Sequence, residues 1–188
     1  DMVSPVTGAA AISWNDLLYV LGGLDSAGNS TTSVRIYDPA TNTWSNGPQL
    51  PDARDNAGVA VLGGHLYVFG GRNRQSGSGP TTATVWRLTT PAGTWESRSS
   101  MPAPRRAFVT GTAAGKIQLF GGESDSAGAI TAVHEYDAGA DAWTTLSAMP
   151  TGRHGPAGDT IAGISYVVGG ATTSGAGSIT PVNEAFTR

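Results

Sequence analysis

The stretch Leu66-Tyr67-Val68-Phe69-Gly70-Gly71, four apolar residues followed by two glycines, decides the fold because the chain repeats it. Equivalent stretches occupy residues 18–23, 117–122 and 165–170. The first glycines of the four pairs are 48, 51 and 48 residues apart. A fixed period of about 20 to 50 residues is typical of solenoids, propellers and arrays. We therefore predict a protein built from four repeats.

Two further landmarks keep the same period. Trp44, Trp95 and Trp143 are 51 and 48 residues apart, and an arginine recurs 16 residues before the first glycine of three pairs. Each arginine follows a proline at the third preceding position: Pro51 with Arg54, Pro102 with Arg105, and Pro150 with Arg153. These landmarks predict one unit over residues 1–188, with repeats at 2–49, 50–100, 101–148 and a partial one at 149–188.

Each repeat contains four short strand signals, named a to d. In the second repeat we predict strand a at 58–62, strand b at 65–69, strand c at 84–88, and a strand d that begins at Trp95. The a–b turns are two residues long, as in tight hairpins. No segment has a sustained 3.6-residue period, so we expect no helices. The predicted fold class is all-β.

The composition narrows the class of protein. Glycine makes up 27 of 188 residues, yet 39% of the chain is hydrophobic, too much for a disordered linker. The net charge of −3 argues against a nucleic-acid partner. No apolar run is long enough to span a membrane. The chain has no cysteine and only three scattered histidines, so we expect no metal and no cofactor.

The repeat resembles a known family. Tyr37-Asp38 with Trp44 and Tyr136-Asp137 with Trp143, together with the Gly-Gly pairs and a period near 50, resemble the Kelch repeat. Leu88 departs from the pattern at the tyrosine position of the second repeat. The resemblance implies a Kelch-type β-propeller with four-stranded antiparallel blades, and six blades are usual in that family.

The fourth repeat is predicted to lack its outermost strand. Phe186 holds its tyrosine position, so the corresponding tryptophan would fall beyond residue 188. The chain also begins Asp1-Met2 without an initiator methionine, which favours a processed chain or a piece of a longer one. Four blades would leave two end faces uncovered. We expect an incomplete ring, or one completed by self-association or by missing blades of a longer parent.

The candidate site lies on one face of the predicted propeller. The b–c and d–a connections share this face, and the b–c loops at 24–33, 72–83, 123–132 and 171–181 are long. Arg54, Arg105 and Arg153 would enter their a strands here, near the central channel, whereas Val6 breaks the series in the first repeat. Such an arc suits a carboxylate, a phosphate or an acidic peptide. The resemblance implies the same, because arginines at this position of Kelch-like substrate adaptors contact acidic peptides.

A structural role for these arginines stays open, in which each one binds loop carbonyls of the adjacent blade. Arg72 is a further candidate ligand contact, Glu123 is expected to pair with an arginine or a ligand amine, and His154 is a candidate acid or base. Asp25 and Asp125, each followed by Ser-Ala-Gly, predict Asx-turns.

The tryptophans fall into two groups. Trp44, Trp95 and Trp143 should wedge between blades. Trp14 and Trp86 lie outside this register and are predicted to be exposed or at a contact between chains.

The favoured function is a non-catalytic binding module that recognises a protein segment or a small anionic ligand on the loop-rich face. One alternative is an enzyme similar to sialic-acid (N-acetylneuraminate) mutarotases, because N-acetylneuraminate epimerases also resemble Kelch propellers. Another is a propeller fragment whose only activity is assembly. Fold alone does not choose among them.

Overall fold

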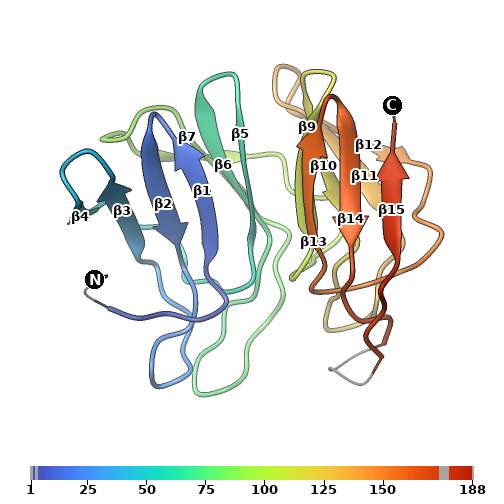
Figure 1. Cartoon of the computed structure of the whole chain (residues 1–188). Helices are drawn as coiled ribbons and strands as arrows, with labels where there is room; N and C mark the ends of the chain where they lie inside the picture. The colour runs from blue at the N-terminus through green and yellow to red at the C-terminus, as the bar shows by residue number, and fades with distance from the viewer. Residues whose placement is uncertain (1, 3, 174–177, 188) are drawn as a thin grey trace.

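The computed structural model describes residues 2, 4–173 and 178–187, which form β-strands and no helix (Figure 1). Four antiparallel sheets, here called blades 1 to 4, follow one another along the chain. The predicted b–c loop at 171–181 lies partly outside the described residues. The all-β prediction and the propeller arrangement are confirmed.

The strands have the following bounds. Blade 1 holds β1 (Ala10–Trp14), β2 (Leu17–Leu21), β3 (Val34–Asp38) and β4 (Thr43–Asn46). Blade 2 holds β5 (Gly58–Leu62), β6 (His65–Phe69), β7 (Val85–Leu88) and β8 (Trp95–Arg98). Blade 3 holds β9 (Val109–Ala113), β10 (Lys116–Phe120), β11 (Val133–Asp137) and β12 (Ala142–Leu146). Blade 4 holds β13 (Ala157–Ile161), β14 (Ile164–Val168) and β15 (Asn183–Phe186).

Each blade is an up-and-down meander whose first strand lies innermost. β1 contacts β5, β5 contacts β9, and β9 contacts β13, so the first strands meet near the axis (Figure 1). The short a–b turns lie at the top of Figure 1 and the long b–c loops at the bottom. The loops predicted to share one face therefore do so.

The a–b turns show why the hairpins are tight. Both residues of every such turn have positive φ, including Asn15 (52°) and Asp16 (61°). This is the geometry of a type I′ turn, which matches the twist of paired strands. Ala114 (49°) and Ala162 (52°) adopt it as well, although a Cβ makes the left-handed region costly. Pairing of the flanking strands therefore overrides local preference at these two alanines.

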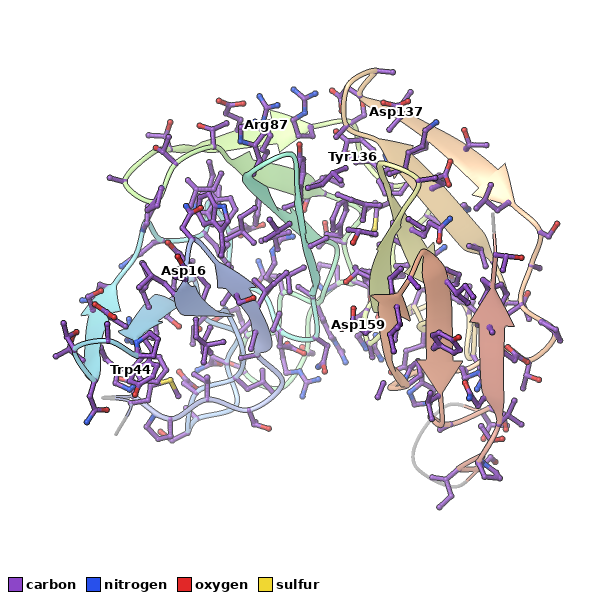
Figure 2. The ribbon with its side chains drawn as sticks, turned by 45° about the horizontal axis from the view of Figure 1, so that its top comes forward. Asp16, Trp44, Arg87, Tyr136, Asp137 and Asp159 are labelled. Carbon is purple, nitrogen blue, oxygen red and sulfur yellow. The ribbon has the colours of Figure 1, made fainter. Side chains whose placement is uncertain are left out.

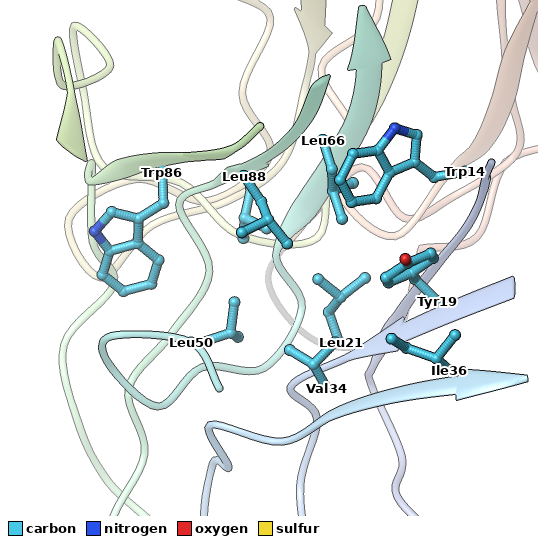
Figure 3. Packing of buried hydrophobic residues seen from close by; sticks show 10 residues of the cluster. Trp14, Tyr19, Leu21, Val34, Ile36, Leu50, Leu66, Trp86 and Leu88 are labelled. Carbon is cyan, nitrogen blue, oxygen red and sulfur yellow. The ribbon is translucent and has the colours of Figure 1, made fainter. Parts of the chain in front are cut away.

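The cores lie between successive blades. Blade 1 contributes Tyr19, Leu21 and Val34 to the core that it shares with blade 2. Blade 2 contributes Leu66 and Leu88 to the same core (Figure 3). Trp14 and Trp86 are buried in the same interface. The prediction that these two tryptophans are exposed or at a chain contact is wrong, because each side chain points into the space between the blades, where the neighbouring blade covers it.

The interface between blades 3 and 4 is more polar. Gln118 Nε2 donates to Glu135 Oε2 at 3.1 Å, and the hydroxyl of Ser165 donates to Gln118 Oε1 at 3.2 Å. These side chains are almost completely buried. The Ser165 hydroxyl also lies 3.0 Å from that of Thr160. Hydrogen bonds thus replace part of the apolar packing that joins the earlier blades.

The end blades each leave one face uncovered. Leu18 on blade 1 is 38% exposed, whereas the equivalent Leu66 is 0% exposed. Val168 on blade 4 is 44% exposed, whereas the equivalent Phe120 is 1% exposed. Ile161 of blade 4 is 66% exposed. Apolar side chains that the other blades bury between them therefore face outward at both ends.

The Gly-Gly pairs lie where one blade meets the next. The N–H of Gly71 donates to the carbonyl of Arg105 at 2.9 Å, and Gly23 donates to Arg54 at the same distance. A Cβ on Gly70, whose φ is +52°, would lie 2.5 Å from the Arg105 carbonyl oxygen. Only glycine permits this approach of backbone to backbone.

We predict that Gly70→Ala lowers the free energy of unfolding by about 2–4 kcal/mol, because left-handed strain and a clash with backbone add together. Gly63→Ala is the matched control: its φ is +59° and open space surrounds its Cβ position. The control should cost only about 1 kcal/mol of strain. Urea unfolding of both variants measures the difference, and equal losses would contradict this account.

Candidate functional site

Three arginines, Arg54, Arg105 and Arg153, here called the motif arginines, precede the first strands of blades 2, 3 and 4. Their exposed fractions are 1%, 1% and 0%. The backbone of each contacts the preceding blade: the N–H of Arg54 donates to Thr31 at 3.1 Å, and its carbonyl accepts from Gly23. The backbone of every motif arginine is therefore part of an interface between blades.

The side chain of each motif arginine binds its own blade. Arg54 Nη1 donates to the Gly70 carbonyl at 2.8 Å, and Arg105 Nη1 donates to the Gly121 carbonyl at 3.2 Å. Arg153 Nη1 donates to the Val182 carbonyl at 2.6 Å. Because backbone and side chain bind different blades, each motif arginine joins two of them.

The second residue of the third strand contacts the guanidinium group in each case. The Arg54 guanidinium carbon lies 3.5 Å from the centre of the Trp86 ring, a cation–π contact. Arg105 Nη2 lies 2.7 Å from Nδ1 of His134. Arginine only donates, so the His134 nitrogen must be the acceptor. An uncharged histidine fits this geometry.

Blades 4 and 1 complete the pattern differently. Arg153 Nη2 forms an ion pair with Glu184 Oε2 at 2.5 Å. In blade 1 Val6 replaces the motif arginine, and an arginine, Arg35, occupies the third-strand position instead. Arg35 Nη1 donates to Asn46 Oδ1 at 2.9 Å.

Burial changes the acidity of these groups. It lowers the pKa of Arg54 to about 9 and that of Arg105 to about 10, which leaves both protonated at neutral pH. Burial, and secondly the charge of Arg105, lower the pKa of His134 to about 4. His134 is therefore neutral near pH 7 and accepts from Arg105 without charge repulsion.

These contacts match the structural role more closely than the ligand-binding arc. The guanidinium groups are buried and directed at backbone carbonyls, as the alternative interpretation expected, although the carbonyls belong to the same blade and not to the adjacent one. A direct contact of Arg54, Arg105 or Arg153 with a ligand stays a prediction. It would require the overlying loops to move.

Charged and polar side chains gather near the motif arginines of blades 3 and 4, where Asp125 is exposed and its three neighbours are only partly exposed. Arg106 contacts Glu123 and Asp125, each at 3.1 Å, and Glu123 Oε1 lies 3.8 Å from His154 Nδ1. Arg106, Glu123, Asp125 and His154 are here called the loop-face cluster. His154 Nε2 donates to the Thr173 carbonyl at 2.8 Å, which fixes the ring.

Backbone bridges hold the cluster at the ends of the first strands. The residue after each motif arginine exchanges two hydrogen bonds with the residue after the Gly-Gly pair, as in Arg106 with Glu123 and Asp55 with Arg72. The N–H of Ala107 donates to the carbonyl of Asn56 in the preceding blade at 2.9 Å. The face is thus tied both within and between blades.

Side chains also join the long loops to one another. Asp125 accepts from the N–H of Thr81 at 2.7 Å and from its hydroxyl at 2.9 Å. The backbone bond from Thr81 lowers the pKa of Asp125. Ser30 donates to Asp55 Oδ2 at 2.6 Å. Asp25 forms the predicted Asx-turn with the N–H of Ala27, whereas Asp125 accepts from Thr81 and Arg106.

The remaining predicted contacts lie close by. Glu123 pairs with an arginine, as expected, and the partner is Arg106. Arg72 Nε donates to the Gly79 carbonyl at 2.8 Å, while its Nη groups donate to none of the described residues. Sequence reasoning missed Arg106. Its signal was its position directly after Arg105, where other repeats carry Asp55 and His154.

A cavity of about 480 Å³ lies between the first strands of the blades. Its lining includes Ser13, Val61, Thr110 and Thr112, and Asp159 is the one carboxylate among the described lining residues. Figure 2, tilted to bring the a–b turns forward, shows Asp159 on β13. In the described part of the chain no three acidic or histidine side chains form a group that could hold a metal ion. Within the same residues no helix is long and apolar enough to cross a membrane.

We predict that the stability of the protein falls as the pH drops from about 6.5 to about 4, because unfolded His134 takes up a proton that the folded state excludes. The loss attributable to this residue is up to about 1.4 kcal/mol per pH unit. His134→Gln keeps a hydrogen-bond acceptor for Arg105 but removes the group that takes up the proton. Urea unfolding between these pH values should show a smaller decline in the free energy of unfolding for the variant than for the unaltered chain. An equal decline in both proteins would contradict this role of His134.

Comparison with known proteins gives a consistent result. Residues 8–183 match a family model described as the KLHDC2/KLHL20/DRC7 Kelch-repeats domain. The chain is similar to Kelch-like protein 35 of Mus musculus, with 32% identity over 124 residues, 66% of this chain and 20% of that protein. It is also similar to Kelch repeat protein M-T8 of Myxoma virus (strain Lausanne), with 39% identity over 79 residues, 41% of this chain and 15% of that protein.

The fold is similar to the solved structure of YjhT, with a TM-score of 0.75 and 20% identity, covering 91% of this chain and 61% of that chain. At that identity the likeness shows the fold alone. The chain thus spans only a part of each of these proteins. Because the family model matches nearly the whole sequence, the chain belongs to the Kelch-repeat domain family.

Proposed function

We propose that the chain is a non-catalytic binding module that recognises an acidic protein segment on its loop-rich face. The observation that carries this proposal is the loop-face cluster, held on loops that are hydrogen-bonded to one another across blades. A rigid surface binds with a smaller entropic cost than mobile loops do. A small anionic ligand uses the same contacts.

Arg72 is the proposed anchor for the acid. Its Nε is fixed by Gly79, so the guanidinium group is oriented, while its Nη groups stay available to a carboxylate. A guanidinium group offers such a ligand two parallel hydrogen bonds. Glu123 in blade 3 and His154 in blade 4 are the further proposed polar contacts. The buried Arg54, Arg105 and Arg153 become positioning residues that support these loops from below.

The geometry of His154 supports a binding role over a catalytic one. Its Nε2 proton is committed to the Thr173 carbonyl, and its Nδ1 faces Glu123, which already pairs with Arg106. A general base needs a free nitrogen within reach of a substrate proton. Neither ring nitrogen is directed at the cavity between the blades.

The test uses twelve-residue peptides with one to four glutamates in a Gly/Ser/Tyr background, screened for binding to the whole chain. We expect acid-containing peptides to bind, and Arg72→Ala to weaken the best of them at least about tenfold, the effect of a lost charge-assisted hydrogen bond. The variant should also flatten the decline of affinity between about 50 and about 500 mM salt.

Arg87→Ala is the matched control. Arg87 is a partly buried arginine that pairs with Glu96, and it lies on strand β7, whereas Arg72 lies in a b–c loop of the loop-rich face. Its loss should leave peptide affinity unchanged. Absence of any acidic binder, or equal losses in both variants, would contradict the proposed function.

The uncovered end faces support a second proposal, that another copy of the chain covers them. Leu18, Ile161 and Val168 would then be buried, as their equivalents are between blades. Light scattering coupled to size exclusion should give about twice the 19.1 kDa of one chain. A monomer at every concentration would rule out self-association and leave the covering blade to a longer polypeptide.

A further inference from the structure

Asp125 occupies a site that is built to hold a carboxylate. Its Oδ2 accepts from the N–H of Thr81 at 2.7 Å, and its Oδ1 accepts from the Thr81 hydroxyl at 2.9 Å and from Arg106 Nη1 at 3.1 Å. Thr81 is 8% exposed and the side chain of Arg106 is 15% exposed, whereas the side chain of Asp125 is 49% exposed. The donors are therefore fixed in the structure, while the carboxylate that they bind lies at the surface.

The same tetrapeptide, Asp-Ser-Ala-Gly, makes different contacts in blade 1. There Asp25 bonds within its own loop, where its Oδ1 accepts from the N–H of Ala27 at 2.9 Å. In blade 3 the tetrapeptide begins one residue later after the Gly-Gly pair, so Ser124 holds the position of Asp25. The Ser124 hydroxyl accepts from the N–H of Ala127 at 3.1 Å. Ser124 thus completes the local turn, and this turn does not depend on Asp125.

The donors that hold Asp125 adjoin the proposed anchor for an acid. Thr81 and Arg72 are partners in an antiparallel bridge within the b–c loop of blade 2. The N–H of Thr81 lowers the pKa of Asp125 most, and the charges of Arg106 and Arg72 lower it further. Arg72 therefore lies near enough to act on a carboxylate at this position. The Asp125 site and the Arg72 anchor are neighbours on the loop-rich face.

We propose that Asp125 is an internal competitor for the acidic ligand: a carboxylate of the bound segment takes its place on Thr81 and Arg106, and Asp125 turns out to solvent. This inference rests on the proposed function, because it requires an acidic ligand on the loop-rich face. It adds a second carboxylate position beside Arg72, so it favours segments that carry at least two acidic residues. No covalent bond changes in this exchange.

The donors are satisfied before and after the exchange. Thr81 and Arg106 keep a carboxylate partner, so no buried donor is left unpaired. The released Asp125 carboxylate is hydrated by water. Because Asp125 is tethered to the site, it competes at an effective concentration on the order of 1 mM or more. The apparent affinity for a ligand acid falls by the fraction of molecules in which the site is open. A segment with a single acid is therefore disfavoured.

The test compares two peptides for binding to the whole chain at about 150 mM salt, where screening limits the effect of distant charges. One peptide carries four glutamates in a Gly/Ser/Tyr background, and the other carries glutamines in their place. Asp125→Ala should bind the glutamate peptide at least about tenfold more tightly than the unaltered chain does, because the competitor is gone. The glutamine peptide should show no such gain.

Asp25→Ala is the matched control. It removes the same charge from the same tetrapeptide, but the donors of Thr81 and Arg106 stay occupied by Asp125. It should change the affinity by less than about threefold, since only a screened charge is lost. In the double variant Asp125→Ala/Arg106→Ala the gain in affinity should disappear.

A measurement on the unaltered chain makes the test independent of how the variants fold. Saturation with the glutamate peptide should raise the pKa of Asp125 toward that of a free carboxyl group, because its hydrogen bonds pass to the ligand. Carbon NMR of the Asp125 carboxyl group follows this titration.

The outcomes separate this inference from the proposed function. If the glutamate peptide binds but Asp125→Ala does not strengthen binding, or if the titration of Asp125 is unchanged in the complex, the inference is overturned and the proposed function stands. An equal gain in Asp25→Ala would also overturn it, because overall charge would then explain the effect. If the glutamate peptide binds neither the unaltered chain nor Asp125→Ala, both are overturned.

Discussion

The clamp between a motif arginine and two Gly-Gly pairs is the interaction on which the other parts of the structure depend. The Arg105 carbonyl accepts from Gly71 in blade 2, while its guanidinium group donates to Gly121 in blade 3. A Cβ at Gly70 would collide with that carbonyl. One residue thus sets the spacing of two blades and positions the long loops near it. Hydrogen bonds to backbone carbonyls offset the cost of burying its guanidinium group.

The interfaces along the chain differ in what holds them. Between blades 1 and 2 the core is apolar, with Trp14 and Leu66 in one cluster. Between blades 3 and 4 the buried Gln118, Glu135 and Ser165 bind one another. Hydrogen bonds of this kind are directional, so they specify one orientation of blade 4 while contributing less than apolar burial to its attachment. An apolar cluster that includes Phe120 and Val167 joins the same two blades, so both kinds of contact attach blade 4.

The period, the strands of the second repeat and the tight turns could be predicted because they depend on local sequence. Gly63-Gly64 sets a turn whatever surrounds it. The positions of Trp86 and Arg106 could not, because their partners come from other segments. Trp86 is covered by blade 1, and Arg106 is oriented by Asp125, 19 residues away. The sequence also could not decide whether Arg54 is buried, because a guanidinium group binds a backbone carbonyl as readily as a ligand carboxylate.

Equivalent positions in the blades separate structural from functional residues. The motif arginines make equivalent backbone contacts in blades 2, 3 and 4, because each carbonyl accepts from the second glycine of the preceding Gly-Gly pair. Other positions carry a different residue in each blade and make different contacts. The residue after the motif arginine is Asp55, Arg106 or His154, and each of the three side chains has different partners. Chemistry specific to this chain should therefore be sought at positions where the residue differs from blade to blade, and the proposed loop-face site lies at such positions.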